Sequence, residues 1–147
     1  FRKWKKEKNL KHIASDLSGN FIADVTYDIT QIPEKESAFD LIVCYHILEH
    51  VIEDTKAMKE LHRVLKSNGT VIIQTPFKEG EIYEDYAITS QAERLLHFEQ
   101  EDHVRIYSVD GLKKRLESVG FTVSVKQFEK DAYLGFSDKE IILFATK

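Results

Sequence analysis

The length, composition and charge of the chain exclude several classes of protein. With 147 residues, 42% of them hydrophobic and 31% charged, the chain suits one globular domain with a sizeable core and is too rich in aromatic residues to be disordered. A formal net charge of −4 argues against general binding to phosphate backbones, because proteins with that task usually carry a basic surplus. Nucleic acid is therefore not an expected partner.

Cysteine usage and hydropathy indicate a reducing, aqueous compartment. Cys44 is the single cysteine, so the chain can form neither an intramolecular disulfide nor a cysteine-cluster metal site. No apolar run approaches the length of a membrane span or a signal peptide. We expect a cytoplasmic protein without a membrane partner. The basic surplus of residues 1–12 fits a solvated helix face better than a contact patch.

The first part of the chain predicts strands that end in carboxylates. After a short helical start, residues 12–15, HIAS, predict a brief strand that ends at Asp16. The alternation in residues 23–27, ADVTY, predicts a second strand before Asp28. Residues 39–45, FDLIVCY, form a continuous apolar run, as expected where both faces of a parallel strand are covered. We expect this third strand near the middle of the sheet.

A parallel crossover should follow that strand. Residues 53–66 place their apolar side chains on one helical stripe, with carboxylates in the first turn and the pair Asn68-Gly69 as a stop signal. Residues 70–75, TVIIQT, predict the next buried strand, which Pro76 closes. A strand, a helix and a strand in this order form a parallel crossover.

A long insertion separates this unit from the end of the chain. Residues 77–107 contain only one short helical stretch, near residues 90–98. Insertions at the end of a strand usually serve a site. No repeat or interdomain linker interrupts the sequence. We expect a single domain over residues 1–147 with this one insertion.

The last part of the chain predicts a helix and two strands. Ser108 can cap a helix that Gly120 ends. Residues 121–125 and 141–146 then form two closing strands, and the polar stretch between them would allow an antiparallel pair.

The segment HILEH, residues 46–50, matches the H-x-x-E-H pattern of one class of zinc peptidases. Histidines at i and i+4 can bind one metal ion when they lie on a helix. Here His46 directly follows a predicted strand, and residues 46–50 should form the turn before the helix, where helical spacing need not hold. No later third ligand is tied to the motif, although His97 and His103 are candidates. We expect no metal site and keep a zinc hydrolase as a remote alternative.

The segment EQEDHVRIY, residues 99–107, has two interpretations. Its side chains include an acid, a possible base, a fixed cation and a phenol, namely Asp102, His103, Arg105 and Tyr107. One interpretation is a hydrogen-bonded loop that anchors the insertion. The other is a substrate site in which His103 is the favoured base.

The order ASDL … ADVTYDIT … IP … FDLIVCYHILEHVIEDTKAMKELHRVLKSNGTVIIQTPF resembles the class I S-adenosylmethionine-dependent methyltransferases, particularly the broad small-molecule group. The resemblance covers roughly residues 12–147. It implies an α/β fold with a doubly wound, mostly parallel Rossmann-like sheet and an antiparallel closing strand. It also implies S-adenosyl-L-methionine as cofactor and in-line transfer of its methyl group to a small-molecule acceptor. A homodimer is possible.

The resemblance assigns roles to residues at the carboxyl ends of the strands. Asp16 would accept hydrogen bonds from the ribose hydroxyls, because a carboxylate offers two acceptors to neighbouring donors. Asp28 would accept from the adenine amino group, and Ile29 would pack on the ring. The pocket beside the methionine moiety would be lined by Cys44, Tyr45 and His46. For Cys44, a packing role is favoured over a nucleophilic one.

The insertion offers candidates for contact with the methyl acceptor. They are Tyr83, Glu84, Asp85 and Tyr86, joined by Asp102, Arg105 and Tyr107.

One family feature has no counterpart in the sequence, namely the first strand with its glycine-rich turn. The six glycines are too scattered to form a G-x-G element. We therefore expect a domain that is incomplete at its N-terminus. The alternative function is a non-catalytic methyltransferase-like domain that serves in binding or assembly.

Overall fold

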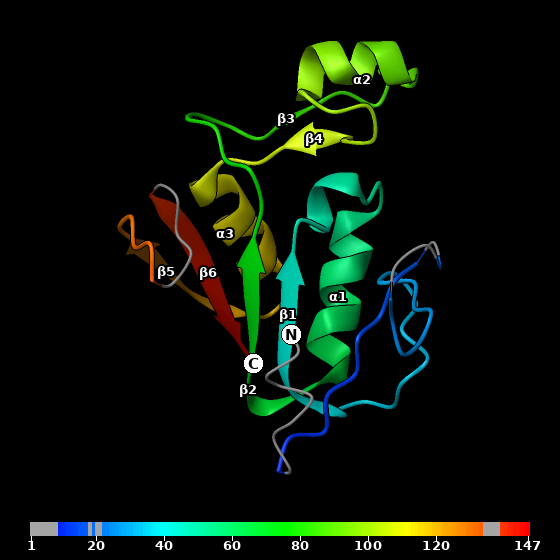
Figure 1. The fold of residues 1–147 in the computed structure, drawn as a ribbon, viewed down its shortest axis with the longest axis vertical. Coiled ribbons are helices and arrows are strands. Elements are labelled where there is room, and N and C mark those ends of the chain that lie inside the picture. The colour runs from blue at the N-terminus through cyan, green and yellow to red at the C-terminus, as the bar shows by residue number, and fades with distance from the viewer. Residues whose placement is uncertain (1–8, 18, 20–21, 134–138) are drawn as a thin grey trace.

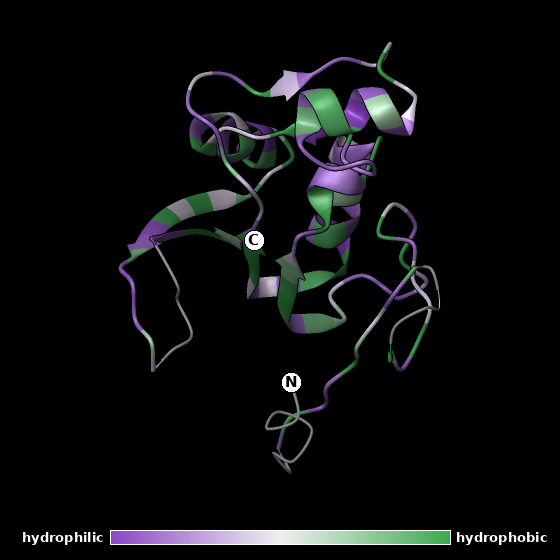
Figure 2. Cartoon of the chain, turned by 45° about the horizontal axis from the view of Figure 1, so that its top comes forward, coloured by the Kyte–Doolittle hydropathy of each residue, from purple (hydrophilic) through white to green (hydrophobic). Residues whose placement is uncertain are grey.

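A sheet with the strand order β1-β2-β6-β5 lies at the centre of the structure (Figure 1). The structure is a computed structural model, and it describes residues 9–17, 19, 22–133 and 139–147. The four strands of this sheet are β1 (Phe39–Tyr45), β2 (Leu65–Gln74), β5 (Thr122–Phe128) and β6 (Glu140–Thr146). Strands β1 and β6 are mostly hydrophobic, whereas the helices carry both hydrophobic and hydrophilic residues (Figure 2). The expected α/β fold class is confirmed.

The crossover predicted from the sequence is present. Strands β1 and β2 pair in parallel, and helix α1 (Asp54–Val64) connects them. The apolar stripe of α1 is buried because it packs on the sheet, and its buried apolar residues are Ala57, Met58, Leu61 and Val64. The helix ends two residues earlier than expected, since Leu65 already pairs with Phe39 of β1.

The closing elements also agree with the prediction. Helix α3 (Val109–Ser118) begins at Ser108, whose hydroxyl accepts a hydrogen bond from the Gly111 N–H at 3.1 Å. Gly120, just beyond the helix, has a φ of +107°, which glycine adopts without strain. Strand β6 pairs antiparallel with both β2 and β5, so the described sheet is mixed and β1–β2 is its parallel part.

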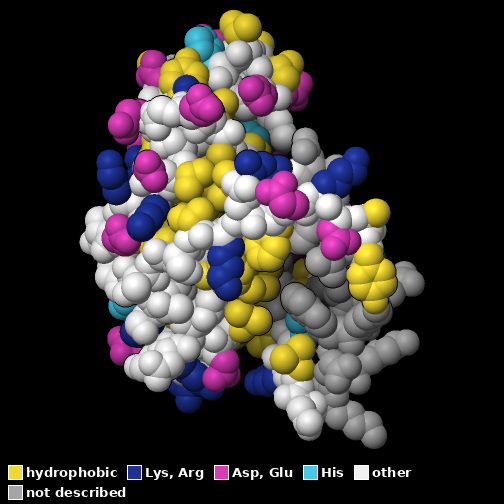
Figure 3. Space-filling view, turned by 90° about the vertical axis from the view of Figure 1, so that its left-hand side faces the viewer, with side chains coloured by type: hydrophobic (Ala, Val, Ile, Leu, Met, Phe, Trp, Pro, Cys, Tyr) yellow, Lys and Arg dark blue, Asp and Glu magenta, His cyan; other side chains and the backbone are white. Residues whose placement is uncertain are grey.

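The expectation that residues 39–45 lie near the middle of the sheet is wrong for the described part of the chain, in which β1 is at the edge of the sheet. Helices α1 and α3 contribute to one hydrophobic core together with the inward residues of the strands, such as Cys44 and Ile73. Residues on the opposite face of β1 stay exposed, with Leu41 at 49% and Val43 at 43%. Hydrophobic side chains also gather on the surface drawn in Figure 3.

The physical reason lies in residues 9–38, which were expected to supply two further strands. Among the described residues they form only one parallel bridge, between Ser15 and Val25. The segment runs beside α1 instead (Figure 1), where the Arg63 guanidinium donates to the carbonyls of Ile32 and Glu34 at 2.8 and 2.7 Å. The strands predicted at 12–15 and 23–27 therefore do not join the sheet. Most of the helical start predicted within residues 1–12 lies outside the described residues.

The insertion, residues 77–107, lies beyond the carboxyl ends of β1 and β2 (Figure 1). It contains a two-stranded antiparallel ribbon of β3 (Tyr83–Glu84) and β4 (Arg105–Ile106). The predicted short helix is confirmed as α2 (Gln91–Phe98), which begins with a reciprocal capping box between Ser90 and Glu93. No helix in the described part of the chain is long and apolar enough to cross a membrane.

Candidate functional site

The chain turns sharply where β1 ends. His46 has a φ of +50°, a left-handed conformation that is uncommon for a residue with a side chain. A single 3-10 turn, η2 (Leu48–His50), follows at once. Residues 46–50 thus form the predicted turn between β1 and α1, with a single 3-10 turn at its end. The turn directs Leu48 and Glu49 into the protein, each with only 1% of its surface exposed.

Strand β4 and its neighbours pack against this turn. The Val104 N–H donates to the Glu49 carbonyl at 2.9 Å. Alternate residues of an extended segment share one face, and here His103, Arg105 and Tyr107 all point inward and are 3%, 0% and 0% exposed. The segment HVRIY is thus fixed to the end of β1.

The Arg105 side chain is hydrogen-bonded to the backbone of this turn. Its guanidinium donates to the carbonyls of Leu48 at 3.2 Å and Ile52 at 2.9 Å, and also to the carbonyl of Val51. These carbonyls follow the end of β1, and the Leu48 carbonyl also accepts from the Val51 N–H at 3.2 Å. The Arg105 Nε also donates to Glu84 at 2.8 Å.

A second group of side chains joins the insertion to both helices. The Tyr107 hydroxyl donates to the Asp54 carboxylate at 2.5 Å, and Arg115 donates to the same carboxylate at 2.5 Å. Arg115 also donates to Glu84 at 2.7 Å. The hydrogen bonds that Arg115 donates to Glu84, and to a smaller extent the one from Arg105, lower the pKa of Glu84 below its ordinary value. Burial and the neighbouring Asp54 raise the pKa of Tyr107 well above 10.

These contacts favour the anchoring interpretation for part of the HVRIY segment. The donors of Arg105 and the hydroxyl of Tyr107 are occupied by protein groups, and both side chains are fully buried. Glu84 is likewise engaged by two guanidinium groups.

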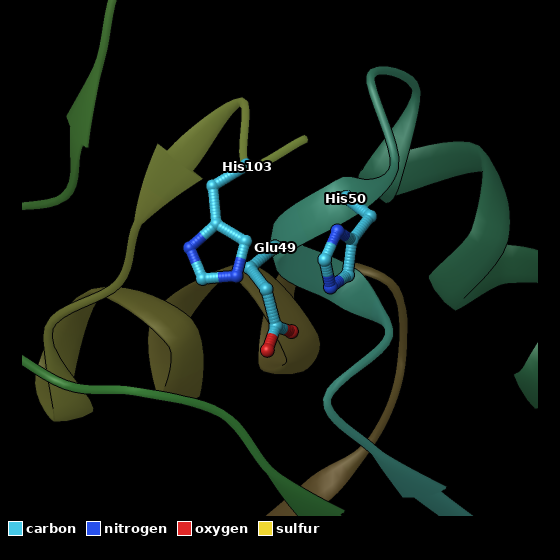
Figure 4. Close-up of side chains that lie close together, drawn as sticks. All are labelled: Glu49, His50 and His103. Atoms are coloured by element: carbon cyan, nitrogen blue, oxygen red, sulfur yellow. The ribbon is translucent and has the colours of Figure 1, made fainter. Parts of the chain in front are cut away.

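Histidines and carboxylates gather where η2 meets the segment before β4 (Figure 4). The imidazole rings of His50 and His103 are 4.7 Å apart between centroids and lie edge to face. His50 Nδ1 is 3.3 Å from the Asp102 carboxylate, and His46 Nδ1 is 3.2 Å from Glu49 Oε1. His46 and His50 do not lie side by side on a helix, so the spacing in HILEH does not produce the peptidase arrangement.

The residues expected to contact the cofactor fall into two groups. Cys44, Tyr45 and His46 lie together at the carboxyl end of β1, where Cys44 is buried and the other two are exposed. Burial, with a smaller effect of the Glu49 charge, raises the pKa of the Cys44 thiol to about 12. This favours the packing role for Cys44.

Asp16, Asp28 and Ile29 belong to the segment beside α1. Asp28 is exposed, and its Oδ1 accepts hydrogen bonds from the Thr30 N–H and hydroxyl, each at 2.8 Å. These hydrogen bonds lower the pKa of Asp28. Asp16 is half-buried, and Ile29 packs against the core.

The four insertion residues expected at the acceptor have different surroundings. The Tyr83 hydroxyl is 2.6 Å from His97 Nδ1, and Asp85 accepts from the Ala87 N–H at 2.9 Å. Tyr86 is 68% exposed and lines a shallow groove of about 470 Å³ beside Ile52 and the first turn of α1.

Sequence reasoning did not single out Asp54 or Arg115, which complete the network around Tyr107. In the sequence both residues look like ordinary charged positions of the predicted helices. Glu49 was considered only as part of HILEH, and the structure shows that it is buried.

Comparison with known proteins identifies the family of this chain. The family model described as a methyltransferase domain matches residues 4–125. The chain belongs to the class I S-adenosylmethionine-dependent methyltransferase family.

Two curated relatives match parts of the chain. An uncharacterized protein of Methanocaldococcus jannaschii is 33% identical over 112 residues, which cover 69% of this chain and 49% of that protein. The ajmaline N-methyltransferase of Rauvolfia serpentina is 30% identical over 69 residues, which cover 47% of this chain and 24% of that enzyme. The chain thus spans half or less of the length of these relatives.

Solved structures share the fold. A methyltransferase of Archaeoglobus fulgidus superposes with a TM-score of 0.66 at 16% identity, covering 100% of this chain and 80% of its own. A possible histamine N-methyltransferase of Thermotoga maritima gives a TM-score of 0.59 at 18% identity, covering 85% and 65%. Another neighbour is a Burkholderia thailandensis N-methyltransferase with bound S-adenosylhomocysteine, with a TM-score of 0.57 at 15% identity and coverage of 89% and 54%.

Proposed function

We propose that this chain is part of an enzyme that transfers a methyl group from S-adenosyl-L-methionine to a small-molecule acceptor. The observation that carries the proposal is the match of the methyltransferase domain to residues 4–125. Supporting it, the insertion lies over the carboxyl ends of two parallel strands (Figure 1), which is where open α/β sheets bind ligands.

The residues present fit the polar groups of this cofactor. Asp28 is exposed, its lowered pKa keeps the carboxylate ionised, and Thr30 occupies only Oδ1. The second oxygen can therefore accept from an amino group or hydroxyl. Asp16 would hold the ribose, Ile29 would pack on the adenine, and Tyr45 and His46 would line the methionine end beside buried Cys44. When bound, the cofactor supplies an electrophilic methyl group on a sulfonium.

The protein would then act mainly by positioning the acceptor and excluding water. Tyr86 is the insertion residue proposed to contact the acceptor, because it is exposed beside a groove. Tyr83, Glu84, Asp85, Arg105 and Tyr107 would support the insertion through the contacts described above. A base is needed only when the acceptor must lose a proton.

Calorimetric titration with S-adenosylmethionine and S-adenosylhomocysteine tests the proposal. Asp28→Asn keeps an oxygen for Thr30 but replaces an acceptor with a donor, so it should weaken binding by about 1–3 kcal/mol, or roughly 5- to 150-fold in Kd. Asp40→Asn is the matched control. Asp40 is also exposed, but it lies near the amino end of β1, away from the proposed site, and pairs with Lys66. Failure of the wild-type protein to bind either compound would overturn the proposal, whereas an unchanged Asp28→Asn would remove only that residue.

A further inference from the structure

Three side chains from two segments direct metal-binding atoms into one small volume. Glu49 and His50 come from η2, and His103 comes from the segment before β4. One ligand atom from each lies within 4.8 Å of the other two. In Figure 4 the two rings stand on either side of the Glu49 carboxylate. The backbone hydrogen bond from Val104 to the Glu49 carbonyl fixes the two segments at this distance.

The Glu49 carboxylate is buried and only half satisfied. Its side chain is 1% exposed, and Oε1 accepts from His46 Nδ1 at 3.2 Å. Oε2 is buried without a hydrogen-bond partner among the described residues. A buried carboxylate oxygen without a donor is costly, and a cation at this point would satisfy it.

The contacts of the two histidines leave the correct nitrogen atoms for a metal ion. His103 Nδ1 is 3.1 Å from the Phe98 carbonyl, which can only accept, so Nδ1 carries the hydrogen and Nε2 keeps its lone pair. The same argument applies to His50, whose Nδ1 faces the Asp102 carboxylate. An imidazole that donates its other N–H to a carbonyl or carboxylate is the arrangement that orients histidine ligands in metal sites.

The local charges also suit a cation. Glu49 contributes one carboxylate, and Asp102 places a second behind His50. The nearby Arg105 guanidinium is compensated by its own partners, Glu84 at 2.8 Å and Asp54 at 3.7 Å.

We propose that Glu49 Oε2, His50 Nε2 and His103 Nε2 bind one divalent first-row transition-metal ion such as Zn²⁺. Two imidazoles and one carboxylate are suitable ligands for such ions. Metal–ligand bonds of about 2.0–2.2 Å require the ligand atoms to lie roughly 3–4 Å apart. Side-chain rotations that move these atoms by on the order of 1 Å would complete the site. Three protein ligands leave a coordination position for water. The proposal departs from the expectation for HILEH, because His46 is not a ligand and His103 supplies the third position in place of a role as base.

Titration of chelator-treated protein with ZnCl₂, followed by calorimetry and by melting temperature, tests this site. The wild-type chain should bind one equivalent of Zn²⁺ saturably and melt at a higher temperature when it is loaded. The variants Glu49→Gln, His50→Gln and His103→Gln should each lower Zn²⁺ affinity at least about 10-fold. His97→Gln is the control, because His97 lies on α2 outside the cluster, and it should bind like the wild type.

His50→Gln decides the matter if the two more buried variants do not fold, because the His50 side chain is 32% exposed. Circular dichroism of the metal-free variant establishes that it is folded. Equal Zn²⁺ affinity of folded His50→Gln and the wild type would overturn the proposal, as would the lack of a saturable equivalent in the wild type. Neither readout depends on methyl transfer, so the result stands apart from the proposed function.

Discussion

The Tyr107 hydroxyl donates to the Asp54 carboxylate at 2.5 Å and thereby joins the last residue of the insertion to the first turn of α1. Arg115 from α3 donates to the same carboxylate. Three elements that are distant in sequence therefore meet at one buried anion. This arrangement holds the insertion over the carboxyl ends of β1 and β2.

Removal of the Tyr107 hydroxyl should destabilise the fold. Tyr107→Phe keeps the ring in the core but takes away one donor from a carboxylate that is 3% exposed. We expect the free energy of unfolding to fall by about 1–3 kcal/mol in urea denaturation. Tyr86→Phe is the control, because Tyr86 is 68% exposed, and it should change stability by less than about 0.5 kcal/mol. Equal effects of the two substitutions would contradict an anchoring role for Tyr107.

Glu84 should make stability depend on pH in the acid range. The pKa of Glu84 in the folded protein lies below the ordinary value of 4.5, and the largest cause is hydrogen bonding from Arg115. The unfolded chain therefore binds a proton more readily than the folded chain. The contribution of Glu84 is fully present above the unfolded pKa and is lost as the pH falls through the folded pKa. Partial exposure screens the ion pairs and keeps the effect modest.

The measurement compares wild type with Glu84→Gln by urea denaturation between about pH 6 and pH 3. We expect the wild type to be the more stable protein at about pH 6, and the difference in the free energy of unfolding to shrink as the pH falls toward about 3. A difference that stays constant over this range would show that Glu84 is not held ionised by the two guanidinium groups.

Cys44 should resist alkylation in the folded protein. Its thiol is 3% exposed, and burial raises its pKa to about 12, with a smaller contribution from the charge of Glu49. The reactive species is the thiolate, so labelling by iodoacetamide near pH 8 should be at least about 100-fold slower in native protein than in urea. The unfolded protein is its own control. Rapid labelling of the native chain would contradict both the burial and the packing role of Cys44.

Much of the fold from residue 39 onward could be predicted from the sequence. Continuous apolar runs marked β1 and β2, and the cap at Ser108 with Gly120 marked α3. These signals are local, so they survive without knowledge of the tertiary structure. The position of β1 at the sheet edge was not predictable in the same way, because it depends on whether residues 12–15 and 23–27 reach the sheet.

The candidate site was less predictable for a related reason. The sequence offered His46 and His50 as neighbours, but the left-handed turn at His46 separates them. His103 meets Glu49 only because Val104 donates to a carbonyl more than fifty positions earlier in the chain. Contacts of this kind have no signature in the spacing of residues.

Gly111 should not tolerate a side chain, although it lies in the first turn of α3. Alanine is intrinsically better than glycine inside a helix by about 1 kcal/mol, so propensity alone favours Gly111→Ala. A Cβ at this position would lie 2.5 Å from Ile82 Cγ1 and 2.7 Å from Ser108 Oγ. Both distances are far below a van der Waals contact.

The two contacts matter because they involve the insertion and the helix cap. Ile82 packs against the core just before β3, and Ser108 Oγ accepts from the Gly111 N–H itself. Overpacking costs about 1–3 kcal/mol, and loss of a serine cap costs about 1 kcal/mol. These costs outweigh the gain in propensity, so we expect Gly111→Ala to be destabilising by about 1–3 kcal/mol. Lys114→Ala is the control, since Lys114 is exposed on the same helix, and it should change stability by less than about 0.5 kcal/mol.

Hydrogen exchange separates a local effect from a global one in Gly111→Ala. If the new methyl group displaces Ile82, the amides around β3 should exchange faster relative to wild type than those of β2, because β2 lies in the middle of the sheet. That result would show that α3 and the insertion are held together by the close approach that glycine permits at position 111. A more stable Gly111→Ala protein with unchanged exchange around β3 would mean that Ile82 rotates away at no cost, and that the insertion is held by Glu84, Arg105 and Tyr107 alone.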